Sequence, residues 1–174
     1  MTYLNVQVSG LSGIPHPALL GIRTTQDAKK LRLHLKFLLG DLLTGQRRSM
    51  DLPGTDPSCQ LCLAPIETTE HILITCRATA EVRRRLLPEL LNVVARVQPS
   101  CQILQNYATA KILAQFILDC TSLNLDNTIR VPSHNPGIIE IFRISRDWCY
   151  ALSNARARLL KSKSNASVTQ PTYQ

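Results

Sequence analysis

The chain has 174 residues, and its 20 Lys and Arg against 12 Asp and Glu give a formal net charge of +8. This length is enough to bury one core, while 7 glycines and 5% aromatic residues favour helices over a β-sandwich. The positive charge favours an anionic partner such as nucleic acid, although a merely soluble basic surface would give the same composition.

Residues 1–10 do not resemble a signal peptide, because no basic segment there is followed by an apolar one. No apolar run approaches the roughly 20 residues needed to cross a bilayer. We therefore expect an intracellular protein, nuclear or cytoplasmic, without membrane binding. In a reducing compartment, its 6 cysteines are more useful as metal ligands than as disulfides.

The chain is expected to begin with an irregular lead-in over residues 1–24, where glycines and prolines interrupt any pattern. A helix is predicted from Thr25, a suitable N-cap, to Leu43, and Gly45 fits its C-terminal stop. Its inward face is expected to carry Leu31, Leu35, Leu38 and Leu42.

The opposite face of this helix is basic, and the positive charge continues just past its end. The residues concerned are Lys29, Arg32, Lys36, Arg47 and Arg48. A basic amphipathic helix tracks phosphates, binds a partner helix or is simply solvated. We predict phosphate contact from charge alone, with the other two interpretations left open.

Residues 56–77 carry the pattern C-x2-C-x8-H-x4-C, formed by Cys59, Cys62, His71 and Cys76. Three thiols and one imidazole are a complete tetrahedral ligand set for Zn²⁺. The first two ligands can hold one ion from a tight turn, while the other two arrive on a short helix predicted for residues 67–75. On an ideal α-helix five residues turn through about 500°, so Cys76 must lie where that helix frays or tightens into a 3₁₀ turn.

Two other interpretations of these cysteines remain open: buried thiols without metal, and a redox Cys-x-x-Cys pair. A thioredoxin-like pair follows a strand in a βαβ unit, whereas Pro57, Pro65 and a predicted helix flank this one. Four protein ligands leave no open coordination position, so the spacing predicts a structural and not a catalytic zinc.

Further helices are predicted beyond the zinc unit. Their expected ranges are 78–87, 88–97, 102–123 and 138–161, with a polar connector at 124–136 and a disordered tail at 162–174. The first contains the compact run Arg83, Arg84 and Arg85, which we add to the predicted phosphate contacts. Three cysteines without ligand spacing are expected to be small core residues: Cys101, Cys120 and Cys149.

The last predicted helix has an apolar stripe from Ile138 to Leu159 that repeats every three or four residues. Such a stripe is either core or a seam for a protein partner. Taken together, the elements predict a mainly α fold, a helical domain over 25–161 with a CCHC zinc knuckle at 56–77.

The chain lacks the motifs that would place an active site within it. There is no P-loop, no G-x-G-x-x-G, no G-x-S-x-G and no H-E-x-x-H. The carboxylates are scattered singly, with no pair suited to a two-metal polymerase or nuclease. We therefore expect a protein that is not an enzyme.

The zinc unit, with the run Glu67 to Leu73 between its second and fourth ligands, resembles the zinc-binding region at the C-terminal end of non-LTR retrotransposon reverse transcriptases of the jockey-like kind. Further segments similar to that family are Leu42-Leu43-Thr44-Gly45, Tyr3-Leu4-Asn5, His16-Pro17 and residues 146–152. The resemblance reaches to about residue 160 and implies binding of element RNA or target DNA. The polymerase motifs are absent, so it implies zinc binding without polymerase activity, in a detached C-terminal piece or a stand-alone derivative.

Two functions therefore stand as hypotheses. The first is a zinc-nucleated helical domain that binds RNA or DNA backbones; few aromatic residues are available for base stacking. The second is a zinc-stapled interaction module, in which the last helix docks on a protein such as a polymerase core supplied in trans. Basic side chains gathered on one face would favour the first hypothesis, and an exposed apolar stripe on the last helix would favour the second.

Overall fold

The structure is a computed structural model that describes residues 17–97, 110–120 and 136–168. These residues form helices and no strand, which confirms the mainly α prediction. In chain order the elements are η1 (Pro17–Leu19), α2 (Thr25–Leu38), α3 (Gly45–Asp51), the π-helix η2 (His71–Thr75), the 3₁₀-helix η3 (Arg77–Thr79), α4 (Ala80–Val97), α5 (Ala110–Leu118) and α6 (Pro136–Val168).

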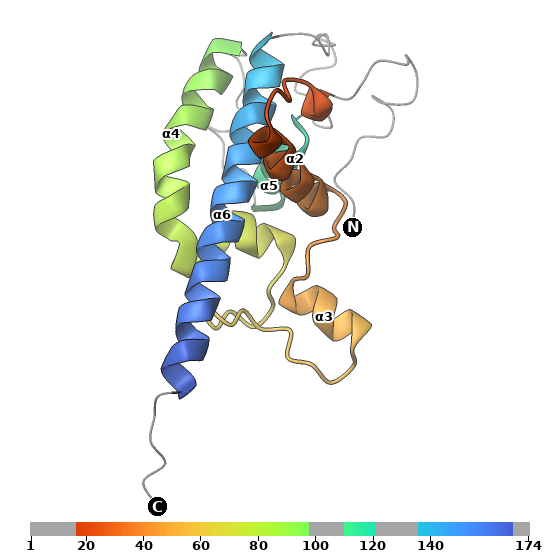
Figure 1. The fold of residues 1–174 in the computed structure, drawn as a ribbon, viewed down its shortest axis with the longest axis vertical. Helices are drawn as coiled ribbons and strands as arrows, with labels where there is room; N and C mark the ends of the chain where they lie inside the picture. The colour runs from red at the N-terminus through yellow and green to blue at the C-terminus, as the bar shows by residue number, and fades with distance from the viewer. Residues whose placement is uncertain (1–16, 98–109, 121–135, 169–174) are drawn as a thin grey trace, which may run out of the picture.

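The long helix α6 is the axis of the fold, with α4 along one side and α2 along the other (Figure 1). Its predicted apolar stripe is buried between them and is therefore core, up to Ala155. The fully buried side chains of this stripe include Phe142, Trp148, Cys149 and Leu152. Burying a large apolar side chain stabilises the fold by roughly 1.5–3 kcal/mol, so this helix contributes substantially to the packing energy.

The N-cap of helix α2 is one residue earlier than predicted, and the helix ends at Leu38 and not at Leu43. Thr24, not Thr25, is the N-cap: its hydroxyl accepts from the Asp27 N–H at 3.1 Å, while the Asp27 carboxylate accepts from the Thr24 N–H at 2.9 Å. The helix stops at Leu38 because Gly40, at φ +69°, turns the chain. The bonds Gly40 N–H to Phe37 C=O and Asp41 N–H to Lys36 C=O form a Schellman motif.

Gly45 starts helix α3 and does not end α2, so its predicted role is wrong. A Cβ at this position would lie 2.4 Å from the Pro57 carbonyl oxygen and 2.9 Å from that of Ser58. The glycine therefore permits a close approach between α3 and the chain that leads into the zinc unit. The helix continues through residues 49–51 and ends at Asp51.

Helix α4 is continuous through Pro88, where the sequence predicted a break. Proline removes one helical hydrogen bond and crowds the preceding turn, but Pro88 is exposed, so the freed carbonyl can be hydrated. Leu90, Val93 and Val94 are buried along the face that packs on α6, whereas Leu91 is exposed. Packing along both halves of α4 outweighs the local cost of Pro88.

The last helix is also longer than predicted, because α6 continues past Lys161 to Val168. Residues 162–168, expected in a disordered tail, are thus helical. Cys120 and Cys149 are buried, as predicted. Cys101, most of the lead-in, the first part of the 102–123 helix and nearly all of the 124–136 connector lie outside the described residues. Among the described helices, none is long and apolar enough to span a membrane.

Candidate metal centre

The four predicted ligands converge beside the C-terminal half of α6, where Arg156 bonds to Glu67 and Lys163 bonds to Gln60. Their ligand atoms all lie within 4.8 Å of one another. The Sγ atoms of Cys59 and Cys76 are 3.9 Å apart, and Cys62 Sγ is 3.2 Å from His71 Nε2. Tetrahedral zinc with bonds of about 2.3 Å to sulfur separates two sulfurs by about 3.8 Å. The four residues therefore form a plausible metal site whose donor set and spacing fit a four-coordinate ion.

The first two ligands sit in a tight backbone knuckle. The Cys59 N–H donates to the Ala64 carbonyl at 2.9 Å, and the Leu63 N–H donates to the Cys59 carbonyl at 2.8 Å. Leu63 takes a left-handed conformation, φ +63°, to close this turn. Backbone N–H groups of Leu61 and Cys62 donate to the Cys59 sulfur. These donors favour the thiolate form that a metal requires.

His71 and Cys76 are brought together by a widened helical turn. The Cys76 N–H donates to the His71 carbonyl at 2.8 Å, a π-type bond that spans five residues. One π turn therefore brings the two ligands onto the same side, which an α-helix would not do. The prediction that Cys76 marks the end of regular helix is correct, but the preceding turn widens, and the 3₁₀ turn of η3 begins only after Cys76.

The imidazole of His71 is suited to bind a metal through Nε2. Burial lowers its pKa, and the charge of Arg83 lowers it further, against an opposing effect of Glu67. Nδ1 lies 3.2 Å from Thr75 Oγ1, so a neutral ring that donates there leaves Nε2 as the acceptor facing Cys62. A ligating histidine fixed through its second nitrogen is typical of metal sites.

The thiols do not ionise equally without a cation. Burial raises the pKa of Cys59 to about 12, in spite of the backbone donors around its sulfur. Burial also opposes ionisation of Cys62, but backbone donors from Ala64 and Arg77 and the neighbouring thiols outweigh it, so its pKa falls below the usual value. A metal ion is the group that would hold all three sulfurs as thiolates at neutral pH.

A buried carboxylate next to the cysteines connects residues 56–77, called here the metal unit, to two helices. Glu67 was expected in the first turn of a helix, but helical geometry begins at Thr69, and Glu67 is fully buried before it. Its Oε2 accepts from the Gly45 N–H at 2.8 Å. The guanidinium of Arg156 on α6 donates to both of its oxygens, at 3.1 and 2.8 Å. Burial opposes its ionisation, but Arg156 and Gly45 keep the Glu67 pKa below its usual value.

The sequence contained no direct signal for this pair, because Glu67 and Arg156 are 89 positions apart. Glu67 lies at the start of the helix predicted for residues 67–75, and Arg156 lies on the last predicted helix. Only the packing of the zinc unit against α6 brings them together.

The predicted phosphate contacts fall into separate groups on the structure. Lys29, Arg32 and Lys36 lie on α2, Arg47 and Arg48 on α3, and Arg83, Arg84 and Arg85 on α4. Helices α2 and α4 flank α6 on different sides, so the groups do not form one continuous patch (Figure 1).

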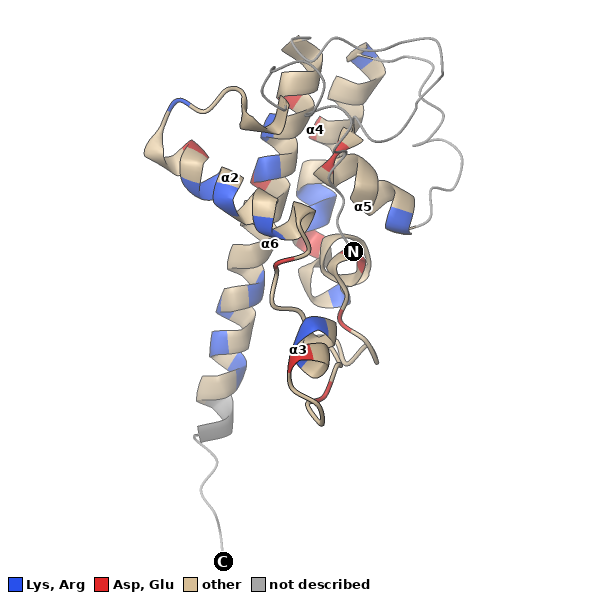
Figure 2. Ribbon diagram, turned by 90° about the vertical axis from the view of Figure 1, so that its right-hand side faces the viewer, with Lys and Arg blue, Asp and Glu red and all other residues tan. Residues whose placement is uncertain are grey.

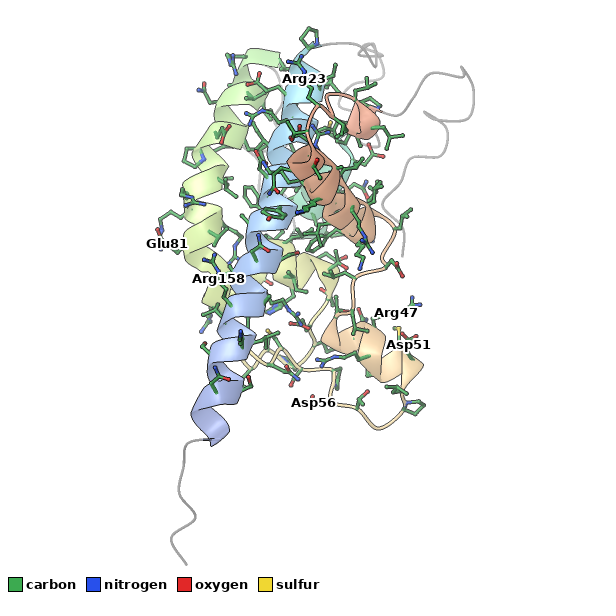
Figure 3. The ribbon with its side chains drawn as sticks, in the orientation of Figure 1. Arg23, Arg47, Asp51, Asp56, Glu81 and Arg158 are labelled. Atoms are coloured by element: carbon green, nitrogen blue, oxygen red, sulfur yellow. The ribbon has the colours of Figure 1, made fainter. Side chains whose placement is uncertain are left out.

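Several of these side chains are occupied within the protein. Arg47 pairs with Asp51 at 3.0 Å on the outer side of α3 (Figure 3). Arg84 pairs with Glu81, and Arg83 turns inward to the metal unit. Lys29, Arg32 and Arg85 are exposed. Their role in nucleic-acid binding stays a prediction.

A second concentration of basic residues lies on the C-terminal part of α6, beside the knuckle (Figure 2). It consists of Arg158, Lys161 and Lys163, called here the basic end of α6. Lys163 Nζ donates to the Gln60 carbonyl at 2.7 Å. Lys161 and Lys163 also line an open cleft of about 550 Å³ with Gln60, Leu160 and Ser164.

Comparison with known proteins adds no relative: no protein-family model, no curated protein and no solved structure matches this chain. The resemblance to the zinc-binding region of non-LTR reverse transcriptases therefore rests on the sequence motifs alone.

Proposed function

We propose that this chain is a zinc-organised helical domain that binds the phosphate backbone of RNA or DNA and is not itself an enzyme. The Cys59, Cys62, His71 and Cys76 cluster is a closed ligand set, in which zinc would have no open position for a substrate. The metal would instead fix the knuckle against α6. The observation that carries the proposal is the basic end of α6, which lies next to this knuckle.

Among the described residues, several exposed basic side chains form no ion pair within the fold. Ion pairs engage six acidic residues, Asp51, Glu67, Glu81, Glu89, Glu140 and Asp147, whereas Asp41 and Asp56 are exposed with no ion pair to a described residue. Exposed basic residues with no ion pair to a described residue include Lys29, Arg32, Arg77, Arg85, Lys111, Arg158 and Lys161. The surplus positive charge is therefore at the surface, where it can meet phosphates.

The basic end of α6 is the most suitable part of this surface. From Trp148 to the last residue the sequence contains no Asp or Glu, so no acidic neighbour on the same helix weakens the positive potential. A helix also holds its charges at fixed spacing along one backbone. Lys163, bonded to the knuckle carbonyls of Gln60 and Leu61, ties the position of these charges to the metal unit.

The sequence resemblance supports the same role, since the corresponding region of non-LTR reverse transcriptases is expected to bind element RNA or target DNA. We therefore propose that the chain is such a C-terminal region or a stand-alone derivative of one. Fluorescence anisotropy with labelled RNA and DNA of equal length would distinguish the two nucleic acids.

Neutralising the basic end of α6 is expected to reduce the salt dependence of binding. In the Arg158→Gln/Lys161→Gln variant, the slope of log affinity against log salt should become less steep by about one to two, because each phosphate contact contributes somewhat less than one. Anisotropy titrations at several salt concentrations give the slope. Lys29→Gln/Arg32→Gln tests the predicted α2 contacts in the same assay.

The matched control is Arg23→Gln/Lys111→Gln, which removes the same charge from exposed positions outside the basic end. Equal loss in the control would mean that only net charge matters. Affinity that does not change with salt would contradict phosphate binding altogether.

A second candidate function is binding of a protein helix, favoured by a groove on α2. The stripe first considered for this role is core, but an open apolar groove of about 300 Å³ follows α2 instead, with Leu31, Leu35 and Leu39 along it and Arg32 and Lys36 beside them. Leu39 is 48% exposed. Two of the three charged residues at the groove are basic, Arg32 and Lys36, and the third is Asp41. An apolar floor with this border fits an amphipathic helix that carries glutamates next to its leucines.

This candidate predicts that Leu39→Ser weakens binding of a labelled helical peptide with leucines at i, i+4 and i+7 flanked by glutamates. We expect about a tenfold loss, the scale of one partly buried leucine side chain. Leu91→Ser, on α4 and 38% exposed, is the control. Unchanged peptide binding in Leu39→Ser, or no binding by the original chain, would exclude this second function without affecting the first.

A further inference from the structure

Arg83 is built into the metal unit and does not face solvent like its neighbours in the arginine run. From the first turn of α4 it reaches back over η3, where Nη1 donates to Thr79 Oγ1 at 2.8 Å and Nη2 donates to the Cys76 carbonyl. Arg83 is half-buried, whereas Arg84 and Arg85 are exposed. Its guanidinium therefore bonds directly to the backbone of the last metal ligand.

The contact of Arg83 with Cys76 places a positive charge next to a site that would be negatively charged with a metal bound. Three thiolates and a neutral imidazole around a divalent cation leave a net charge of about −1. Glu67 adds another negative charge close to Cys59, and Arg156 neutralises that carboxylate through two hydrogen bonds. Arg83 is a second cation near the thiols, since Cys76 and Cys62 act on it electrostatically. Two arginines, from α4 and α6, thus balance two negative charges.

We propose that Arg83 is a positioning residue that neutralises the net negative charge of the metal-loaded centre and thereby couples metal binding to the docking of α4. With the metal bound, the half-buried guanidinium has a counter-charge. Without the ion, no ligand bond fixes the Cys76 backbone to which Arg83 donates, and Arg83 keeps the desolvation cost of burial with less in return. Metal binding and packing of the α4 N-terminus therefore favour each other, as any thermodynamic coupling is reciprocal.

This inference rests on the metal site of the proposed function but not on nucleic-acid binding. It also withdraws Arg83 from the predicted phosphate contacts, because its two Nη atoms are engaged within the protein. Arg85, exposed on the same helix, remains available for phosphates and serves as the matched control.

The test is zinc affinity of the full chain, measured by competition with a chromophoric chelator, for the original sequence, Arg83→Met, Arg83→Lys and Arg85→Met. Arg83→Met should bind zinc about 10–100-fold more weakly, the usual effect of losing a group that supports the ligands. Arg83→Lys, which keeps the charge but not the planar fork, should lie between. Arg85→Met should match the original chain.

A change of ligand separates charge neutralisation from packing. Cys62→His converts the site to two thiolates and two imidazoles, which carries no net charge with a divalent ion. Cys62 is the least buried of the three thiols in this site, and the Co²⁺ spectrum verifies that the altered centre is tetrahedral. In this background Arg83→Met should lose little affinity.

An equal loss in both backgrounds would overturn the proposal, because it would mean that Arg83 acts by packing alone. Arg83→Met and Arg83→Lys within about twofold of the original chain would overturn it as well. Failure of the original chain to bind zinc would instead refute the proposed metal function itself.

Discussion

Removing the metal is expected to unfold the segment from Asp56 to Arg77 and to loosen the centre of the domain. Metal binding contributes about 10–16 kcal/mol in small structural zinc units, as much as the total stability of about 5–15 kcal/mol of an ordinary domain. The segment carries buried Ile72 and Leu73, which belong to the common core. Loss of the ion would release them with the ligands.

Trp148 provides the measurement, because it is the only tryptophan and its indole N–H donates to the Leu73 carbonyl at 3.3 Å. Chelation with EDTA, or the substitution Cys76→Ala, should shift its emission to longer wavelength and lower the midpoint of urea unfolding. Elemental analysis should give one zinc per original chain. Cys120→Ala removes a buried cysteine outside the metal site and should retain the ion. Full zinc content in Cys76→Ala would contradict the assigned ligand set.

The cluster of candidate metal ligands could be predicted from the sequence because metal coordination depends on residue type and short spacing. Cys59 and Cys62 lie two residues apart in a turn, and His71 and Cys76 five positions apart on one helical segment. What spacing could not specify is how the helix accommodates the last step. A π turn and a 3₁₀ turn can both end a regular α-helix. Which of the two forms here depends on where the side chains of His71 and Cys76 must lie and on how η2 packs against α5 and α6.

The end of the first helix was predicted wrongly for a different reason: either of two glycines could have been its C-terminal stop. Gly40 and Gly45 both follow leucine-rich sequence, and both could end a helix. The deciding difference is tertiary, since only Gly45 must accommodate the Pro57 carbonyl, while Gly40 takes the left-handed conformation. Pro88 was likewise overridden by packing of α4 on α6. Local propensity is a weak guide where long-range contacts differ.

The residues that support the metal unit were beyond sequence reasoning altogether. Arg83 belongs to a run of three arginines, and Arg156 is one of several basic residues spaced along the last helix. Such basic segments usually indicate a solvated or phosphate-binding face. Their actual partners are a backbone carbonyl of a ligand and a buried carboxylate. Buried charges need compensation, so a search for cations near a negatively charged metal site could find such residues once a fold is known.

Breaking the pair between Glu67 and Arg156 is expected to cause a large stability loss, although neither residue is a metal ligand. Glu67 has a side-chain exposure of 1%, and that of Arg156 is 20%. Removing one partner of a buried pair costs about 3–5 kcal/mol, because the other charge is left without compensation. The two substitutions should lower the free energy of unfolding unequally. Arg156→Met leaves the fully buried Glu67 carboxylate without a counter-charge beside the thiolates, whereas Glu67→Gln leaves a guanidinium that can still reach water.

Urea unfolding of the zinc-loaded protein measures this difference, with Glu140→Gln as the control. Glu140 pairs with Arg96 at 3.3 Å on the surface, where an ion pair contributes about 0–1 kcal/mol. Arg156→Met should therefore be the least stable variant, Glu67→Gln intermediate and Glu140→Gln close to the original chain. The double variant Glu67→Gln/Arg156→Met should recover part of the loss, because it buries no unpaired charge. A loss in Arg156→Met no larger than in Glu140→Gln would mean that this pair does not connect the metal unit to α6.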